Sequence, residues 1–181
     1  MFKLESIIFN HGNESQSYKF SQHAFVYGKN TVGKTALTVV IDYILGGSVS
    51  LSYDGLDNID SIEAYITNEQ TELWIKRDCS DGYFYKRTLE SEYSEVSLEV
   101  YKENLCLLMT QGSGDHYMDV YKRVFDEKPT YRSFTFLNFI EEKGLGDLSI
   151  VFTRGKEIRH QIRIRNIMTF FFNYENIEQI Y

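Results

Sequence analysis

The chain has 181 residues, of which 43% are hydrophobic and 15% aromatic, and its formal net charge is −7. This composition predicts one domain with a packed core, and the acidic balance argues against a protein that coats nucleic acid through its overall charge. Cys79 and Cys106 form neither a metal-binding spacing nor a disulfide framework, as is typical of a reducing compartment. No apolar stretch approaches the ~20 residues of a membrane span, and the first ten residues lack the apolar run of a signal peptide. We therefore expect a cytoplasmic protein that does not enter a membrane.

Short strands separated by turn residues are expected at the start of the chain. The strand candidates are residues 4–9, 17–20 and 24–27. The third candidate runs directly into Gly28, and an apolar helix is expected from Lys34 to Leu45, where Gly46 and Gly47 would end it. The predicted order is strand, glycine-rich loop and buried helix.

The middle of the chain has a different pattern. Strand candidates at 62–67, 72–77 and 83–88 are joined by connections of about four residues, which are too short for a parallel return and predict an antiparallel meander. Helices are expected at 98–109 and 133–143, with an interruption at 112–115. Residues 158–172 fit either a strand or a helix.

The segment Gly28-Lys29-Asn30-Thr31-Val32-Gly33-Lys34-Thr35, followed by Ala36, matches the phosphate-loop pattern G-x-x-x-x-G-K-[ST]. Glycines let the backbone curl so that successive N–H groups point at phosphate oxygens, and the following helix start also favours an anion. Lys34 would reach the terminal phosphates, and the Thr35 hydroxyl would bind Mg²⁺. The motif predicts binding of a nucleoside triphosphate, which we take to be ATP with Mg²⁺; the alternative is an ordinary glycine turn.

Other parts of a working ATPase are harder to find. Hydrolysis requires a second acidic residue for Mg²⁺ and a group that positions water, usually after an apolar strand. No run of four apolar residues leads into Asp-Glu, and Asp54, Asp57 and Asp60 follow no strand candidate. No catalytic residue is therefore assigned in this chain.

The first 47 residues resemble the N-terminal lobe of the chromosome-processing ATP-binding-cassette ATPases, the group of the structural-maintenance-of-chromosomes and RecF proteins. The resemblance rests on the N-terminal strand, the turn near His11, the Tyr27-Gly28-Lys29-Asn30 start of the phosphate loop and the helix ending at Gly46-Gly47. It is specific over residues 1–47 and loose over 48–181. Thr31-Val32 departs from the small residues usual before the second glycine.

The resemblance implies an α/β fold: half of a P-loop ATPase head, with a mixed sheet, an antiparallel meander and flanking helices. The chain would form one ATP-binding domain over 1–181, with substructure at 1–47, 48–95 and 96–181, the last part leading towards a coiled coil. ATP would close a dimer of heads, so the partner would be a second head or the missing C-terminal lobe, with DNA bound in the assembled complex. Hydrolysis would need that completion. Glu175 or Gln179 would stand in the place of the family's glutamine loop.

Two weaker groups of residues have alternative interpretations. His11 would either stack on the adenine base or serve only as a turn residue. A basic cluster either contacts DNA or an acidic partner, or forms a solvated face; it consists of Arg154, Lys156, Arg159, His160, Arg163 and Arg165.

Two rivals to the half-head hypothesis remain open. A stand-alone P-loop kinase or NTPase would need an acidic base after a strand, and a non-catalytic module would bind nucleotide only to order an interface. Among biological roles, DNA repair and anti-phage defence both fit such an ATPase.

Overall fold

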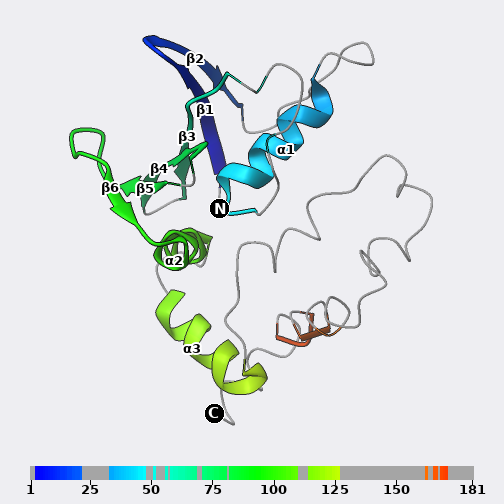
Figure 1. The fold of residues 1–181 in the computed structure, drawn as a ribbon. Coiled ribbons are helices and arrows are strands. Elements are labelled where there is room, and N and C mark those ends of the chain that lie inside the picture. Colours follow the sequence, from blue (N-terminus) through cyan, green and yellow to red (C-terminus); the bar gives the residue numbers. More distant parts are fainter. Residues whose placement is uncertain are drawn as a thin grey trace. The chain divides into compact units, whose positions relative to one another are not determined.

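A computed structural model gives the fold of the chain (Figure 1). The residues that it describes are 3–21, 33–47, 51, 56, 58–68, 71–80, 82–109, 114–126, 162, 165–166 and 168–170. Contacts divide the chain into two compact units, Met1–Gly112 and Ser113–Tyr181.

The first unit contains an open antiparallel sheet. Its described strands are β1 (Lys3–His11), β2 (Glu14–Lys19), β3 (Ser61–Thr67), β4 (Glu72–Asp78), β5 (Tyr83–Lys86) and β6 (Ser94–Val96). Their order across the sheet is β2-β1-β3-β4-β5-β6, and every neighbouring pair is antiparallel. The meander expected from the short connections is confirmed, and β6 extends it beyond the prediction. The sheet formed by the described residues is antiparallel throughout rather than mixed as expected, and the strand expected at 24–27 lies outside the described residues.

Strand alternation divides the sheet into an inner and an outer face. Ile7, Ala64 and Ile75 are aligned across β1, β3 and β4, and each is at most 1% exposed. Because successive strand residues point to opposite faces, these side chains all belong to the inner face. This face carries the apolar core of the first unit.

A β-bulge changes the register near the start of β1. Leu4 pairs with Ile66 and Ser6 pairs with Tyr65, so that Glu5 is the additional residue between them. Leu4 and Ile7 therefore face the same side although they are three positions apart.

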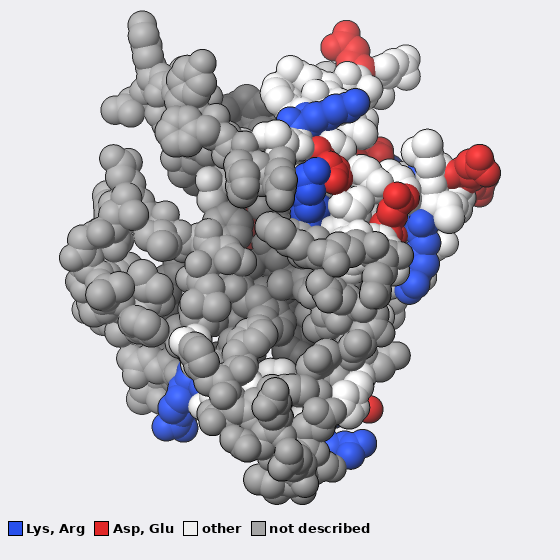
Figure 2. Space-filling view, turned by 180° about the vertical axis from the view of Figure 1, so that it is seen from behind, with Lys and Arg blue, Asp and Glu red and all other residues white. Residues whose placement is uncertain are grey.

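The outer face is built from aromatic rings and charged groups. Tyr65 and Trp74 are opposite each other on β3 and β4, and their rings stack with centroids 4.5 Å apart. Glu63 accepts hydrogen bonds from Asn10 (2.9 Å) and from the hydroxyl of Tyr93 (2.7 Å). Burial, followed by the bond to Glu63 and its charge, raises the pKa of Tyr93. In the space-filling view, acidic and basic groups of the described surface stand beside one another rather than in blocks of one sign (Figure 2).

Two helices cover the inner face of the sheet (Figure 1). Helix α1 spans Lys34–Ile44 and helix α2 spans Leu98–Met109, which confirms both predicted helices. The rings of Tyr83 on β5 and Tyr101 on α2 lie 5.4 Å apart, and α1 packs against β3 and β4. An α/β architecture with an antiparallel meander and flanking helices is therefore present in the first unit.

The second unit is described only in part. Helix α3 spans Gly114–Phe125, where no helix was expected, and it begins within the interruption expected at 112–115. Tyr121 packs against Phe125 and Phe170, with ring centroids 4.8 and 5.2 Å apart. The described residues between 162 and 170 are helical, which favours the helical alternative there, whereas the helix expected at 133–143 lies outside the described residues.

Within the described part of the chain, no helix is both long enough and apolar enough to cross a membrane.

Candidate phosphate-binding site

Gly33, the second glycine of the motif, stands immediately before α1 in a left-handed conformation, with φ 84° and ψ 11°. L-residues with a side chain avoid this conformation, whereas glycine adopts it without strain. The carbonyl of Gly33 accepts the N–H of Leu37 at 2.9 Å, which is the first bond of the helix. The sequence prediction that the helix begins at Lys34 is therefore confirmed, and the glycine of the motif is at the helix N-cap.

The N-terminal end of α1 has the properties of an anion site. The first N–H groups of any helix lack partners within the helix, and they carry the positive end of its dipole. No side chain makes a capping hydrogen bond at Gly33, and the first turn contains no acidic residue. Among the described contacts, no side chain therefore competes with an external anion for these donors.

The structure describes only part of the predicted loop. Gly28, Lys29, Asn30, Thr31 and Val32 lie outside the described residues, as do the side chains of Lys34 and Thr35. Lys34 and Thr35 form the first positions of α1 through their backbone, and Ala36 is half-buried in the same turn. The contacts of Lys34 with phosphate and of Thr35 with Mg²⁺ remain predictions.

The opposite end of α1 is closed by two glycines. Gly46 has φ 87° and donates its N–H to the carbonyl of Tyr43 at 3.1 Å. Gly47 donates to the carbonyl of Asp42 at 2.8 Å, which completes a Schellman motif. A Cβ on Gly47 would lie 2.6 Å from that same carbonyl oxygen, so only glycine fits. The predicted stop at Gly46-Gly47 is confirmed.

His11 lies at the end of β1, beside the hairpin turn. Its Nδ1 is 4.0 Å from an Asp60 carboxylate oxygen, which also accepts the backbone N–H of Gly12 at 2.6 Å. Both side chains are more than 60% exposed. The described contact of His11 is therefore with the chain before β3, and its stacking on adenine stays a prediction.

A second acidic ligand for Mg²⁺ does not emerge from the described residues. Within them, no group of three or more His, Cys, Asp or Glu side chains is arranged to hold a metal ion. Asp60 contacts the hairpin turn, and Asp54 and Asp57 lie outside the described residues. A lone Thr35 ligand would leave Mg²⁺ coordinated mainly by water and phosphate oxygens.

Most of the remaining predicted residues fall outside the described part of the chain. These are Glu175, Gln179, Arg154, Lys156, Arg159, His160 and Arg163. Arg165 is described as an exposed residue in a helical segment of the second unit.

A group of side chains that the sequence did not indicate as a unit holds the C-terminal end of α1. Arg77 on β4, Tyr43 on α1 and Tyr101 on α2 converge there through hydrogen bonds to main-chain carbonyls. The sequence pattern did indicate where Arg77 faces. Leu73, Ile75 and Arg77 occupy every second position of the strand, so Arg77 faces inward with its two apolar neighbours.

No protein-family model matches the chain, and no curated protein matches it either.

Proposed function

We propose that this chain binds Mg-ATP at the N-terminal end of α1 and serves as the N-terminal half of a chromosome-type ATPase head. The observation that carries the proposal is the coincidence of the motif with the geometry that it requires. Gly33 is left-handed and caps a helix that begins at the lysine of the G-K-T sequence. A phosphate loop needs a glycine at this point because the backbone must turn its N–H groups towards the anion.

The order and direction of the strands in the sheet support the half-head hypothesis. The strands before the loop, β1 and β2, join the strands after α1 in one antiparallel sheet. An antiparallel lobe of this kind is what the resemblance to chromosome-processing ATPases implies. The strand at 24–27 would then belong to a second, mixed sheet, completed by the other lobe of the head.

The proposed role of ATP is to join two heads rather than to be hydrolysed by this chain alone. The loop would supply a phosphate cradle, the Lys34 ammonium and the Thr35 ligand to Mg²⁺, which suffice for binding. Hydrolysis also needs an oriented water and stabilisation of charge on the transferred phosphoryl group. These would come from a second head or from the missing lobe.

A titration of the purified chain with Mg-ATP, paired with a measurement of phosphate release, tests the proposal. Wild type is expected to bind ATP and to release phosphate far more slowly than the ~1–100 s⁻¹ typical of kinases. Lys34→Ala is expected to abolish binding while circular dichroism stays unchanged. Equal ATP affinity in wild type and Lys34→Ala would overturn the phosphate-loop assignment, and turnover of about one per second or faster would favour a stand-alone enzyme.

We extend the proposal to DNA only for the assembled complex. An acidic chain with one basic cluster should hold duplex weakly and with steep salt dependence. Replacing Arg159 and Arg163 with Glu should leave ATP binding unchanged and weaken DNA retention by the complex. Tight duplex binding by the isolated chain at physiological salt would instead indicate an autonomous DNA-binding domain.

A further inference from the structure

Arg77 is the charged residue that the described structure buries. It lies on the inner face of β4, opposite Ile62 on β3 and Tyr83 on β5, and is only 5% exposed. Removing a guanidinium from water is costly unless the group gains hydrogen bonds and favourable charge contacts. Its contacts therefore show what the fold gains by placing it there.

The guanidinium closes the C-terminal end of α1. Its Nη1 donates to the carbonyl of Tyr43 at 2.9 Å and to the carbonyl of Gly47 at 2.6 Å. The guanidinium carbon lies 3.7 Å from the centroid of the Tyr43 ring and 4.9 Å from that of Tyr83. A cation at this end of a helix also complements the negative end of the dipole.

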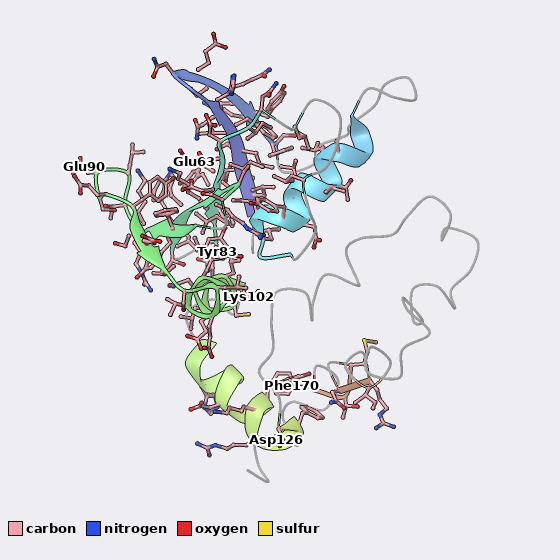
Figure 3. All side chains as sticks on the ribbon, viewed as in Figure 1. Glu63, Tyr83, Glu90, Lys102, Asp126 and Phe170 are labelled. Atoms are coloured by element: carbon pink, nitrogen blue, oxygen red, sulfur yellow. The ribbon has the colours of Figure 1, made fainter. Side chains whose placement is uncertain are left out.

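Three further contacts hold the same turn. The hydroxyl of Tyr43 donates to the carbonyl of Asp78 at 3.0 Å, which links α1 to the end of β4. The hydroxyl of Tyr101 on α2 donates to the carbonyl of Ile44, and burial raises the pKa of Tyr101 well above its ordinary value, so this hydroxyl stays protonated. The aliphatic stem of Lys102 lies against Gly46. Figure 3 labels Lys102 on α2 and Tyr83 on the neighbouring meander.

The C-terminal half of α1 is more buried than its first turn. Tyr43, Ile44 and Leu45 are at most 4% exposed, whereas Ala36 and Leu37 are half-buried and Thr38 is exposed. The helix has 11 residues, so its two ends lie about 16 Å apart at ~1.5 Å per residue. Over that length, a tilt of about 4° at the fixed end moves the first turn by about 1 Å.

We propose that Arg77 is a positioning residue for the phosphate loop: it fixes the far end of α1 to β4 and thereby sets where the first-turn N–H groups meet the phosphates. This inference rests on the proposed function of the loop. Displacements of about 1 Å are enough to weaken oriented contacts substantially. The central strands of the sheet would then determine nucleotide affinity without touching the nucleotide.

Variants at two adjacent positions of β4 test the inference. Arg77→Met removes both hydrogen bonds of Nη1 together with the charge, and Arg77→Lys keeps the charge. Lys76→Met is the matched control because Lys76 lies on the outer face, 5.2 Å from the Phe84 ring centroid. Mg-ATP dissociation constants are measured at a temperature at which each variant is folded, alongside urea unfolding. Arg77→Met is expected to raise the dissociation constant at least tenfold, Arg77→Lys by a smaller factor, and Lys76→Met by less than twofold.

The outcomes separate positioning from stability alone. A role confined to stability would lower the urea midpoint of Arg77→Met or Arg77→Lys and leave the dissociation constant of the folded protein unchanged, which overturns the inference. If wild type itself binds no Mg-ATP, the proposed function fails and the inference fails with it. If wild-type binding depends on Lys34 but not on Arg77, only the inference fails.

Hydrogen exchange on the wild-type chain keeps the inference testable even if Arg77→Met and Arg77→Lys do not fold. Saturating Mg-ATP is expected to slow exchange at the N–H groups of Gly46 and Gly47, beyond any change in the β1–β2 hairpin. Slowing limited to residues 33–37 would show that the two ends of α1 are not coupled and would overturn the proposal.

Discussion

At its N-terminal end helix α1 follows a single glycine, Gly33, whereas at its C-terminal end it runs into the pair Gly46-Gly47. A Cβ on Gly33 would meet nothing within 4 Å, while a Cβ on Gly47 would collide with the backbone of Asp42. The last turn also receives hydrogen bonds from Arg77 and Tyr101, and the first turn receives no side-chain cap. One end of the helix is thus held by side chains from β4 and α2, whereas the described contacts give the other end no side-chain cap.

The largest loss of stability is expected from Gly47→Ala. The added methyl would lie 2.6 Å from the Asp42 carbonyl oxygen, so the turn must open and lose the Schellman bond. Overpacking of this kind costs about 3 kcal/mol. Urea unfolding measures the change, and a loss below about 1 kcal/mol would show that this end of the helix yields more easily than its geometry indicates.

The same substitution at the other end should affect stability less and binding more. Gly33→Ala meets open space, so its cost is the strain of a left-handed residue, about 1–2 kcal/mol. We expect the dissociation constant for Mg-ATP to rise at least tenfold because the N–H groups of the loop are reoriented.

Gly12→Ala is the control for Gly33→Ala, since Gly12 also has a positive φ of 55° and open space around its Cβ. It should lose a similar amount of stability and keep the ATP affinity of wild type. Equal affinities of Gly12→Ala and Gly33→Ala would remove the functional distinction between the ends of α1.

Tyr101→Phe tests the hydrogen bond between α2 and the last turn of α1. Leaving the Ile44 carbonyl without this donor should cost about 1–2 kcal/mol at neutral pH. Burial raises the pKa of Tyr101 in the folded chain, so the folded state holds this proton more tightly than the unfolded state. The stability that comes from this raised pKa is fully present below about pH 10. It is lost above that pH at about 1.4 kcal/mol per pH unit.

Urea unfolding between pH 9 and 11 measures this alkaline loss. The stability of Tyr101→Phe should fall less steeply than that of wild type above pH 10, because one linked proton has been removed. Parallel slopes for the two proteins would contradict the assignment.

The smallest effect is expected from His11→Ala. The contact between His11 and Asp60 is long and both side chains are exposed, so its loss should change the unfolding free energy by less than about 0.5 kcal/mol. We also expect Mg-ATP affinity within twofold of wild type. A clear loss of ATP affinity with unchanged affinity for inorganic triphosphate would place His11 against the adenine base.

Local patterns predicted the parts of this fold that depend on neighbouring residues. The alternation of 62–67 and 72–77, the glycine pair after Leu45 and the apolar run from Ala36 all gave elements that the structure contains. Strand β6 was missed because three residues, Ser94–Val96, include one apolar side chain. Helix α3 was missed altogether because Gly112 and Gly114 were interpreted as helix breakers, although the helix that begins at Gly114 buries Val120 and Tyr121.

The candidate site, too, was predictable only where it depends on neighbouring residues. The motif itself predicted the position of Gly33 and the start of α1. Arg77 and Tyr43 are 34 positions apart in the chain. The alternation along β4 predicts that Arg77 faces inward, but it does not predict which residue Arg77 contacts. Which carbonyls a buried guanidinium meets is decided by strand register and helix packing, and these are long-range properties of the fold.

The bulge in β1 has a consequence for how the length of the chain can vary. Glu5 is the additional residue between the Leu4–Ile66 and Ser6–Tyr65 pairs. Deleting it would make these two pairs consecutive in a regular ladder, with no change of register on either side. A deletion between Ile7 and Phe9 would instead turn the residues on its N-terminal side to the opposite face and expose apolar side chains. A single-residue deletion should therefore be tolerated at Glu5 and excluded three positions later, so that the start of β1 can shorten while the strand that leads to the hairpin keeps its core contacts.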